Sequence, residues 1–282
     1  MKTFVAIIRL IRPHQWLKNL MIFFPPFLSG AFLPIAMVSN GLVPFAAFCF
    51  ASSANYIFND LVDRGKDLIH PVKCNRPLPS GQVSAPMAIV LCGVLTFFSV
   101  AVSLQISKLF LYYVIIYLGL SVAYSLLLKH MPIVDAFCIS FGFVLRLYAG
   151  GEAFNVQISD WLFLSVFLLA TFLSFGKRFS ERHQLGPEAG AHRRTLEDYP
   201  EGFLDGTLYL SGSAVLVTYA MYAITKPGMV YTVPLCVFGL LRYIMRIKAG
   251  QGGDPTDALL HDIPLLITGI LWVMLVGWCV YL

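Results

Sequence analysis

Asn59–Asp67, with the sequence NDLVDRGKD, follows directly after a long apolar run, Gly41–Phe58. A chain that is 58% hydrophobic has little reason to gather three carboxylates where an apolar segment ends. If the helix of the apolar run continues through this stretch, Asp60, Asp63 and Asp67 lie at i, i+3 and i+7 and share one face. The stretch therefore predicts a membrane-spanning helix that carries a polar site at its end.

Oxygen atoms grouped on one helix face suit Mg²⁺, which usually takes one or two carboxylates and completes its shell with substrate phosphates. The predicted metal ligands are the oxygen-bearing side chains of the motif: Asn59, Asp60, Asp63 and Asp67. Lys66, Lys73 and Arg76 follow closely and are expected to hold the anion that the metal carries. The alternative is a solvated helix end whose acids and bases serve solubility.

The composition extends the membrane prediction to the whole chain. Of 282 residues only 12% are charged and 14% are aromatic, and the mean hydropathy is +0.75. This profile is typical of an all-α, polytopic membrane protein, so we expect residues 1–282 to form one membrane domain with no nucleic-acid partner. The N-terminus is too short and too mixed for a cleavable signal. Six scattered cysteines without a CxxC pair predict neither a disulfide framework nor a zinc site.

Apolar runs predict nine transmembrane helices, each near the roughly 20 residues that a bilayer requires. Their expected ranges are 19–37, 41–62, 84–104, 109–128, 132–151, 160–179, 203–224, 229–248 and 263–281. Residues 1–18 mix lysine and arginine with large apolar side chains, which is typical of an amphipathic helix on the membrane surface. The polar connections 64–82, 180–202 and 249–262 are expected to be loops.

Lysine and arginine gather on one side of these nine spans, and this sets the expected orientation. The N-terminal tail and the ends of the even-numbered spans carry most of the basic residues, whereas the opposite side carries only Lys108 and Lys226. We therefore expect the N-terminus and the three polar loops in the cytoplasm, the C-terminus outside, and the protein in the inner or plasma membrane. Eight spans instead of nine would break the asymmetry.

A second charged cluster, Lys177, Arg178 and Glu181, ends the sixth predicted span on the same expected side. Glu181 lies one helical turn from both cations, so it can pair with either. One interpretation is a local ion pair at the membrane boundary, with long side chains reaching to water. The other is two cations aimed at a phosphate, with Glu181 orienting them or joining a metal shell.

Three further charges fall in or at the ends of spans. Arg242 ends the eighth predicted span before the glycine-rich loop Gly250–Pro255, and it is a candidate anion ligand, although the positive-inside rule alone also explains it. Asp135 and Arg146 lie inside the fifth span about 16 Å apart along a helix, so they cannot pair directly. A charge inside a span predicts a functional site. Arg146 is expected either to reach an anion in a central cavity or to tie its helix to another.

With these motifs placed, nearly the whole chain resembles the UbiA-type intramembrane prenyltransferase superfamily. NDLVDRGKD matches its first acidic motif, which holds a diphosphate through Mg²⁺. Typical aromatic prenyltransferases carry a second acidic motif, DxxxD, where this chain has KRFSE at Lys177–Glu181. This departure and four other motifs make the chain similar to the decaprenyl-phosphate phosphoribosyltransferase branch. These motifs are RPHQWLKN at Arg12–Asn19, HPVKCNRP at His70–Pro77, GFVLR at Gly142–Arg146 and LRY at Leu241–Tyr243.

The branch resemblance implies Mg²⁺-dependent transfer of 5-phosphoribose from phosphoribosyl pyrophosphate to a polyprenyl (decaprenyl-like) phosphate, with release of pyrophosphate, in cell-envelope biosynthesis. The nine predicted helices would then surround a central cavity open to the cytoplasmic side. A basic group where the superfamily usually has an acid suits the second anion of this donor, its 5-phosphate. The implied catalytic residues are Asp60, Asp63, Lys177 and Arg178. The implied substrate-binding residues are Lys18, Asn59, Lys73, Arg76, Arg146, Glu181, Arg242 and Tyr243, with Lys18 at the head of the acceptor.

Three alternatives stay open at this point. An aromatic prenyltransferase of the quinone type would use an isoprenyl diphosphate donor, and the basic second motif argues against it. A transporter would be expected to carry charges along a continuous path, whereas most charge here gathers on one face. A catalytically dead scaffold would not require an intact NDxxD sequence.

Overall fold

The computed structural model describes residues 2–31, 35–69, 72–185 and 194–282, and these residues form helices and connections without any strand. The chain packs into two compact units. Unit 1 comprises residues 1–24, 34–129 and 145–156, and unit 2 comprises residues 25–33, 130–144 and 157–282. The expectation that residues 1–282 form one membrane domain stays a prediction.

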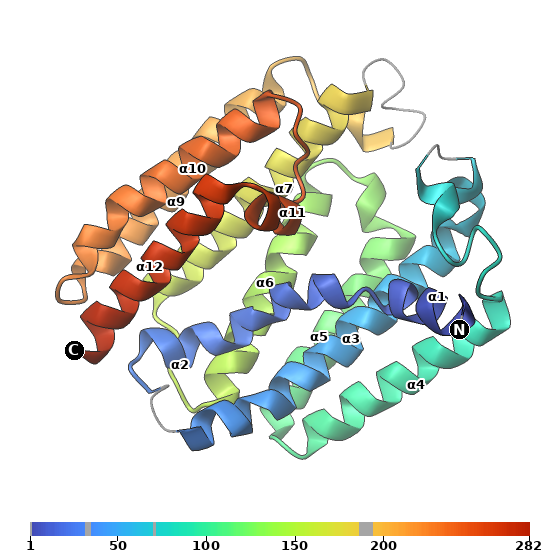
Figure 1. The fold of residues 1–282 in the computed structure, drawn as a ribbon, viewed down its shortest axis with the longest axis horizontal. Coiled ribbons are helices and arrows are strands. Elements are labelled where there is room, and N and C mark those ends of the chain that lie inside the picture. Colours follow the sequence, from blue (N-terminus) through green and yellow to red (C-terminus); the bar gives the residue numbers. More distant parts are fainter. Residues whose placement is uncertain (1, 32–34, 70–71, 186–193) are drawn as a thin grey trace. The chain divides into compact units, whose positions relative to one another are not determined.

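Unit 1 is organised around the long helix α3, which packs along α4 and α5 and against the 3₁₀ helix η1 (Figure 1). Its elements are α1 (Lys2–Ile11), η1 (Pro13–Phe23), α3 (Ile35–Leu68), η2 (Lys73–Asn75), α4 (Ala85–Leu104), α5 (Lys108–Leu126), most of η3 (Leu128–His130) and the second part of α6 (Val134–Ala153). Ser84 and Ser107 cap α4 and α5 by accepting backbone N–H bonds from the first turn, which fixes where these helices begin. The core between them is apolar and includes Phe48, Phe110 and Val114.

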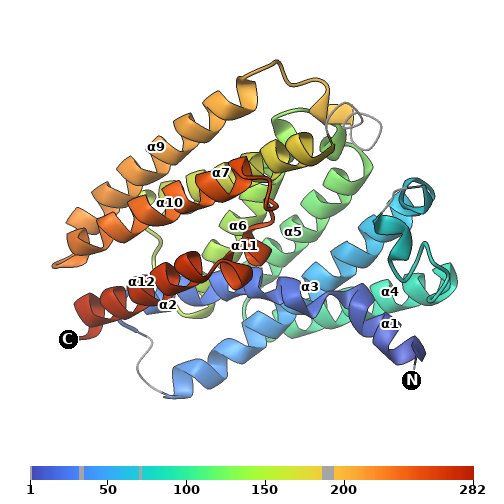
Figure 2. The ribbon, with the colours of Figure 1, turned by 45° about the horizontal axis from the view of Figure 1, so that its top comes forward.

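Unit 2 places α7 beside α9 and α10 beside α12, as both ribbon views show (Figure 2). Its elements are the rest of α2 (Phe24–Leu28), the first part of α6, α7 (Asp160–Leu185), η5 (Arg194–Leu196), α9 (Phe203–Ile224), η6 (Met229–Thr232), α10 (Val233–Lys248), α11 (Pro255–His261) and α12 (Ile263–Tyr281). Phe172, Phe175, Leu208 and Tyr243 lie in its core.

Eight helices of the described residues are long and apolar enough to cross a membrane. On α4 the large side chains of Ile89, Val90 and Phe97 are exposed, and on α12 those of Met274 and Trp278 are exposed as well. Exposed apolar side chains along an apolar helix are what contact with lipid requires. The prediction of an all-α, multi-pass membrane protein is confirmed.

The expected count of nine spans is not confirmed, because the first predicted span, 19–37, is not one α-helix. Its described part consists of the end of η1 followed by the five residues of α2. η1 keeps 3₁₀ hydrogen bonds of the i→i−3 kind as far as Phe23, and Pro25 and Pro26, which have no N–H to donate, lie in the first turn of the short helix α2, where proline is tolerated. The surface helix is also shorter than the predicted 1–18, because α1 ends at Ile11.

Candidate active site

The acidic motif lies at the end of α3 in unit 1, and the helix continues through it to Leu68. The predicted shared helix is therefore confirmed. Asp60 and Asp67 are buried, whereas Asp63 and Asn59 are partly exposed.

Basic side chains from other elements contact the carboxylates of Asp60 and Asp67. The guanidinium Nη2 of Arg12 donates to both oxygens of Asp60, at 2.5 and 2.7 Å. Arg76 Nη1 lies 2.6 Å from Asp67 Oδ2 and 3.2 Å from Asp60 Oδ1, so it bridges the two acids. Leu78 is fully buried in the core beneath α1, which anchors the loop that carries Arg76.

The third carboxylate pairs with a lysine from a more distant part of the chain. Lys129, in η3, donates to Asp63 Oδ1 at 2.6 Å. Each acid of the motif is thus neutralised by a base from elsewhere in unit 1. Sequence reasoning predicted Arg76 but missed Arg12 and Lys129, which lie 48 and 66 residues from their partners. Only the RPHQWLKN motif gave a signal for Arg12.

Arg12 has an unusual backbone conformation between α1 and η1. Its φ of 53° and ψ of 62° lie in the left-handed region, which residues with a Cβ rarely adopt. The following Pro13 disfavours a right-handed helical Arg12 by steric clash, so the helix ends here. The guanidinium also lies over the ring of Tyr56, 5.1 Å from its centroid.

Three other residues predicted for the site also belong to unit 1. Lys18 is half-buried on η1, and Lys73 is half-buried at the start of η2, three residues before Arg76. Asn59 lies one turn before Asp63. The roles of these residues in substrate binding stay predictions, and His70 of the HPVKCNRP motif lies outside the described residues.

The donor set of the motif fits a hard divalent cation in part. Carboxylate and amide oxygens are the ligands that Mg²⁺ takes, and Asp60 and Asp63 lie one turn apart. Among the described residues, however, no three His, Cys, Asp or Glu side chains stand together as a preformed metal cluster. A bound Mg²⁺ would therefore depend on water and substrate oxygens to complete its shell.

Arg146 of α6 forms a buried polar cluster within unit 1. Its Nε donates to Asn19 Oδ1 at 2.8 Å, and its Nη2 donates to the Tyr117 hydroxyl at 2.7 Å. Asn19 in turn donates to Ser52 Oγ at 3.1 Å. These contacts join α6, η1, α5 and α3, so the geometry is that of a structural tie, one of the two alternatives for this residue.

In unit 2, Arg178 lies in the interior near the end of α7, with its side chain only 2% exposed. Its Nε donates to Asp135 Oδ2 at 2.8 Å, and its Nη1 donates to Glu181 Oε2 at 2.6 Å. The hydroxyl of Tyr199 donates to Asp135 Oδ1 at 3.4 Å. Two carboxylates thus neutralise Arg178, and Asp135 gains the partner that the sequence did not identify.

Lys177, the neighbouring cation, has a more open position. Its side chain is 38% exposed, and its Nζ lies 3.1 Å from Asp254 Oδ2 at the start of α11. The loop before α11 lies directly against α7: a Cβ added to Gly253 would come within 2.6 Å of Ser180 Cβ. Only glycine permits this approach, which brings Asp254 to Lys177.

The LRY motif holds the same loop and the start of α12. The hydroxyl of Tyr243, which is 4% exposed, donates to the Gly253 carbonyl at 2.8 Å. Arg242 donates two hydrogen bonds of 3.0 Å to Asp262, one to each carboxylate oxygen. These hydrogen bonds hold the pKa of Asp262 below its usual range. Both motif residues are engaged within unit 2, and their predicted contact with substrate is untested.

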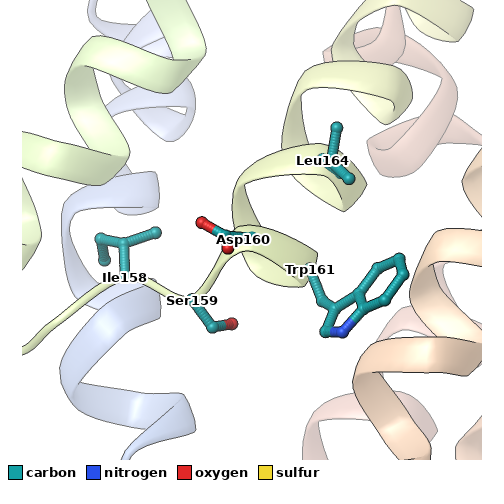
Figure 3. A pocket seen from close by; sticks show the side chains of 5 residues that line it. All are labelled: Ile158, Ser159, Asp160, Trp161 and Leu164. Atoms are coloured by element: carbon teal, nitrogen blue, oxygen red, sulfur yellow. The ribbon is translucent and has the colours of Figure 1, made fainter.

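A hollow of about 460 Å³ lies at the opposite end of α7 from Lys177. Ile158, Ser159 and Asp160 line it together with Trp161 and Leu164 of the first turns (Figure 3). Asp160 begins α7 seventeen residues before Lys177, about 26 Å along a helix. The hollow therefore does not belong to the charged cluster at Lys177.

Comparison with known proteins agrees with the geometry. The UbiA prenyltransferase family matches residues 23–263. The decaprenyl-phosphate phosphoribosyltransferase of Mycolicibacterium smegmatis is 32% identical over 98% of this chain and 92% of that protein. The protein of the same name from Corynebacterium glutamicum is also 32% identical, over 98% of this chain and 87% of its own.

A solved structure shares the fold at lower identity. A UbiA homolog from Archaeoglobus fulgidus, bound to GPP and Mg²⁺, has a TM-score of 0.77 and 21% identity, covering 98% of this chain and 99% of that one. The resemblance that the motifs indicated is confirmed. The chain belongs to the UbiA prenyltransferase family.

Proposed function

We propose that this transferase moves 5-phosphoribose from phosphoribosyl pyrophosphate to a polyprenyl phosphate and releases pyrophosphate. The observation that carries the proposal is the combination of an acidic motif on α3 with a partly exposed lysine, Lys177, where prenyltransferases usually carry a second acidic motif. Relatives that are 32% identical over 98% of this chain bear the name decaprenyl-phosphate phosphoribosyltransferase, which supports the same donor and acceptor classes.

The charges of the substrates favour this reaction. An isoprenyl diphosphate carries one anionic head, which two metal-binding motifs can clamp. Phosphoribosyl pyrophosphate carries a second anion at the far end of the ribose, and the acceptor lipid phosphate brings a third. Lys73, Arg76 and Lys177 are the basic side chains of the motifs that would supply cations for these phosphates.

The reaction replaces one bond at ribose C1 with another. The C1–O bond to pyrophosphate breaks with oxocarbenium character, and an oxygen of the lipid phosphate forms the new bond to C1, by analogy with glycosyl transfer. Because the acceptor is already an anion, it needs little help from a general base. Asp60 and Asp63, with Asn59 and Asp67, would hold Mg²⁺, which would supply positive charge to offset the charge growing on the leaving oxygens.

The proposal includes an orientation in the plasma membrane, with the N-terminus and both charged helix ends in the cytoplasm. Lysine and arginine of the connections support this orientation. An odd number of crossings is needed, and η1 with α2 can supply the ninth. Eleven 3₁₀ residues and five α-helical residues have a contour length of about 30 Å, the thickness of the hydrocarbon core.

The direct test is transfer of label into lipid. The purified protein is incubated with Mg²⁺, labelled phosphoribosyl pyrophosphate and a panel of polyprenyl phosphates, and label is counted in the organic phase. Asp60→Asn and Asp63→Asn should each lower the rate by about a hundredfold or more, because the charge on the leaving group loses its stabilisation. Asp257→Asn, an exposed acid in α11, is the matched control.

A second candidate is prenyl transfer from an isoprenyl diphosphate, which the family description itself favours. Labelled isoprenyl diphosphate with an aromatic acceptor distinguishes the two. Label in the organic product from this donor, and none from phosphoribosyl pyrophosphate, would reject phosphoribose transfer.

The proposal also requires both charged helix ends to reach one small donor. Spin labels at Arg64 and Gln184, exposed residues near the ends of α3 and α7, report their separation in reconstituted protein. We expect a distance below about 30 Å, since helix ends on opposite sides are separated by more than the hydrocarbon thickness. A distance above about 40 Å would exclude a shared site.

A further inference from the structure

Asp60 has no carboxylate oxygen available to a cation in this structure. Both oxygens accept a hydrogen bond from Arg12 Nη2, and Oδ1 also accepts one from Arg76. The carboxylate is 1% exposed, and the Arg12 side chain that covers it is 19% exposed. A metal ion therefore reaches Asp60 only if the guanidinium of Arg12 leaves.

Hydrogen bonds to α3 hold the backbone on both sides of Arg12, whereas the long side chain of Arg12 can change its conformation. Ser53 of α3 donates to the carbonyl of Ile11 at 2.9 Å and accepts a 3.0 Å hydrogen bond from Trp16 Nε1. These bonds tie the chain to α3 on both sides of the left-handed residue. The guanidinium stands on a flexible stem, so it can turn from Asp60 to another anion without movement of α1 or η1.

Arg12 differs from the other two bases of the motif in what it loses when a metal binds Asp60. Arg76 bonds one oxygen of Asp67, Oδ2, and Lys129 bonds one oxygen of Asp63, Oδ1, so both bases can keep these contacts while the other oxygen of each acid turns to a metal. Within the described residues Arg12 pairs with a single carboxylate, Asp60. A cation bound at Asp60 both removes this partner and repels the guanidinium at short range, while two oxygens of a bound diphosphate can accept parallel N–H bonds from the planar guanidinium instead.

We propose that Arg12 is a ligand of the donor's diphosphate that is held on Asp60 until metal and diphosphate bind. The guanidinium then passes from the carboxylate to the phosphate oxygens, and Asp60 becomes a metal ligand. This inference rests on the proposed function only in that the donor carries a diphosphate. It assigns Arg12 two opposite effects: it competes with the bare metal, and it strengthens binding of the metal–diphosphate pair.

The test measures both effects by binding rather than by turnover. Free Mn²⁺ is followed by electron paramagnetic resonance during titration of the purified protein without substrate. Pyrophosphate binding in the presence of Mg²⁺ is followed by calorimetry. In Arg12→Gln we expect Mn²⁺ to bind several-fold more tightly, and pyrophosphate to bind about tenfold more weakly because a charge-assisted bidentate contact is lost.

Arg9→Gln is the matched control, since Arg9 is exposed on α1 and its replacement makes the same change in net charge. Both affinities should stay near those of the wild type in this variant. Arg12→Lys keeps the charge but lacks the planar fork, so pyrophosphate affinity should fall between those of wild type and Arg12→Gln.

The outcomes separate this inference from its rivals. If Arg12→Gln weakens the binding of both Mn²⁺ and pyrophosphate, or changes neither affinity, the proposed passage of Arg12 from Asp60 to the diphosphate is rejected. Arg12 is then a structural partner of Asp60. Weaker binding of ribose 5-phosphate with unchanged pyrophosphate binding also rejects the assignment to diphosphate. The measurements need neither phosphoribosyl pyrophosphate nor lipid, so failure of the proposed transfer reaction would leave their result intact.

Discussion

The ends of α3 and α7 both carry clusters of acids and bases, but the clusters are built differently. At the end of α3, three acids face three bases from separate elements of unit 1, and Arg12 and Arg76 remain 19% and 28% exposed. At the end of α7, Arg178 is 2% exposed and lies between Asp135 and Glu181. Opposite charges alone therefore do not indicate an available binding site.

The difference teaches which charges can change partner. A base at the edge of the α3 cluster can release its carboxylate to a metal and meet a phosphate instead. Release of Arg178 would cost several kcal/mol of free energy, about 3–5, because it would leave Asp135 charged and unpaired in the interior. We infer that Lys177 is the residue of the KRFSE motif that meets substrate, while Arg178 holds α7 to the start of α6.

The largest effect that we expect is the loss of folding stability when Arg178 is replaced. Arg178→Met should lower the free energy of unfolding by about 3–5 kcal/mol, because it leaves the buried carboxylate of Asp135 without its partner. Thermal melting in detergent measures the loss. The double variant Asp135→Asn with Arg178→Met should recover part of it, since no buried charge remains. An Arg178→Met protein that melts like wild type but fails to bind donor would assign Arg178 to the substrate instead.

Lys177→Met is the matched substitution at the adjacent residue. We expect it to change the binding of substrate rather than the stability of the fold. Lys177 is partly exposed, so its pair with Asp254 should contribute at most about 1 kcal/mol to stability. Loss of a charge-assisted contact to phosphate should raise the KM for phosphoribosyl pyrophosphate about tenfold. Steady-state kinetics and a melting curve on the same preparation check both. A large fall in melting temperature with unchanged KM would reverse the roles given to the two cations.

Much of the helical layout could be predicted from the sequence, because apolar runs of about 20 residues are decisive in a membrane protein. The predicted span 203–224 matches α9 at both ends, and 263–281 matches α12. The miss at 19–37 lies where the 3₁₀ helix η1 is followed by the short helix α2. The helix α11 was missed because only seven residues form it and because it follows the glycine-rich stretch 250–253, whose composition disfavours a helix.

The site was predictable as a set of motifs but not as a set of pairs. Helical spacing alone anticipated the pair of Arg178 with Glu181, which lie three residues apart. The partners of Asp60 and Asp63 come from 48 and 66 residues away, and only tertiary packing brings them together. For the same reason the sequence showed Asp135 as a lone charge inside a span.

The smallest expected effect concerns Asp262, which pairs with Arg242 and caps α12 by accepting the N–H of Leu265. Its pKa is lowered in the folded protein, mainly by the hydrogen bond from Arg242. A carboxyl group with a lowered folded pKa stabilises the fold above its unfolded pKa of about 3.9, and this stability is lost as the pH falls through the folded value. Asp262→Asn should therefore lower the melting temperature at pH 7, and this effect should shrink as the pH falls below the unfolded pKa.

Asp257→Asn supplies the control, because Asp257 is exposed in the same short helix and its replacement removes the same charge. The melting temperatures of the three proteins should draw closer together as the pH falls from 7 to 3, with Asp257→Asn close to wild type throughout. If Asp262→Asn is destabilised equally at both ends of this range, the hydrogen-bonded cap rather than the ionised carboxylate stabilises α12. The ion pair with Arg242 would then contribute little to stability, in contrast to the buried pair of Arg178 with Asp135.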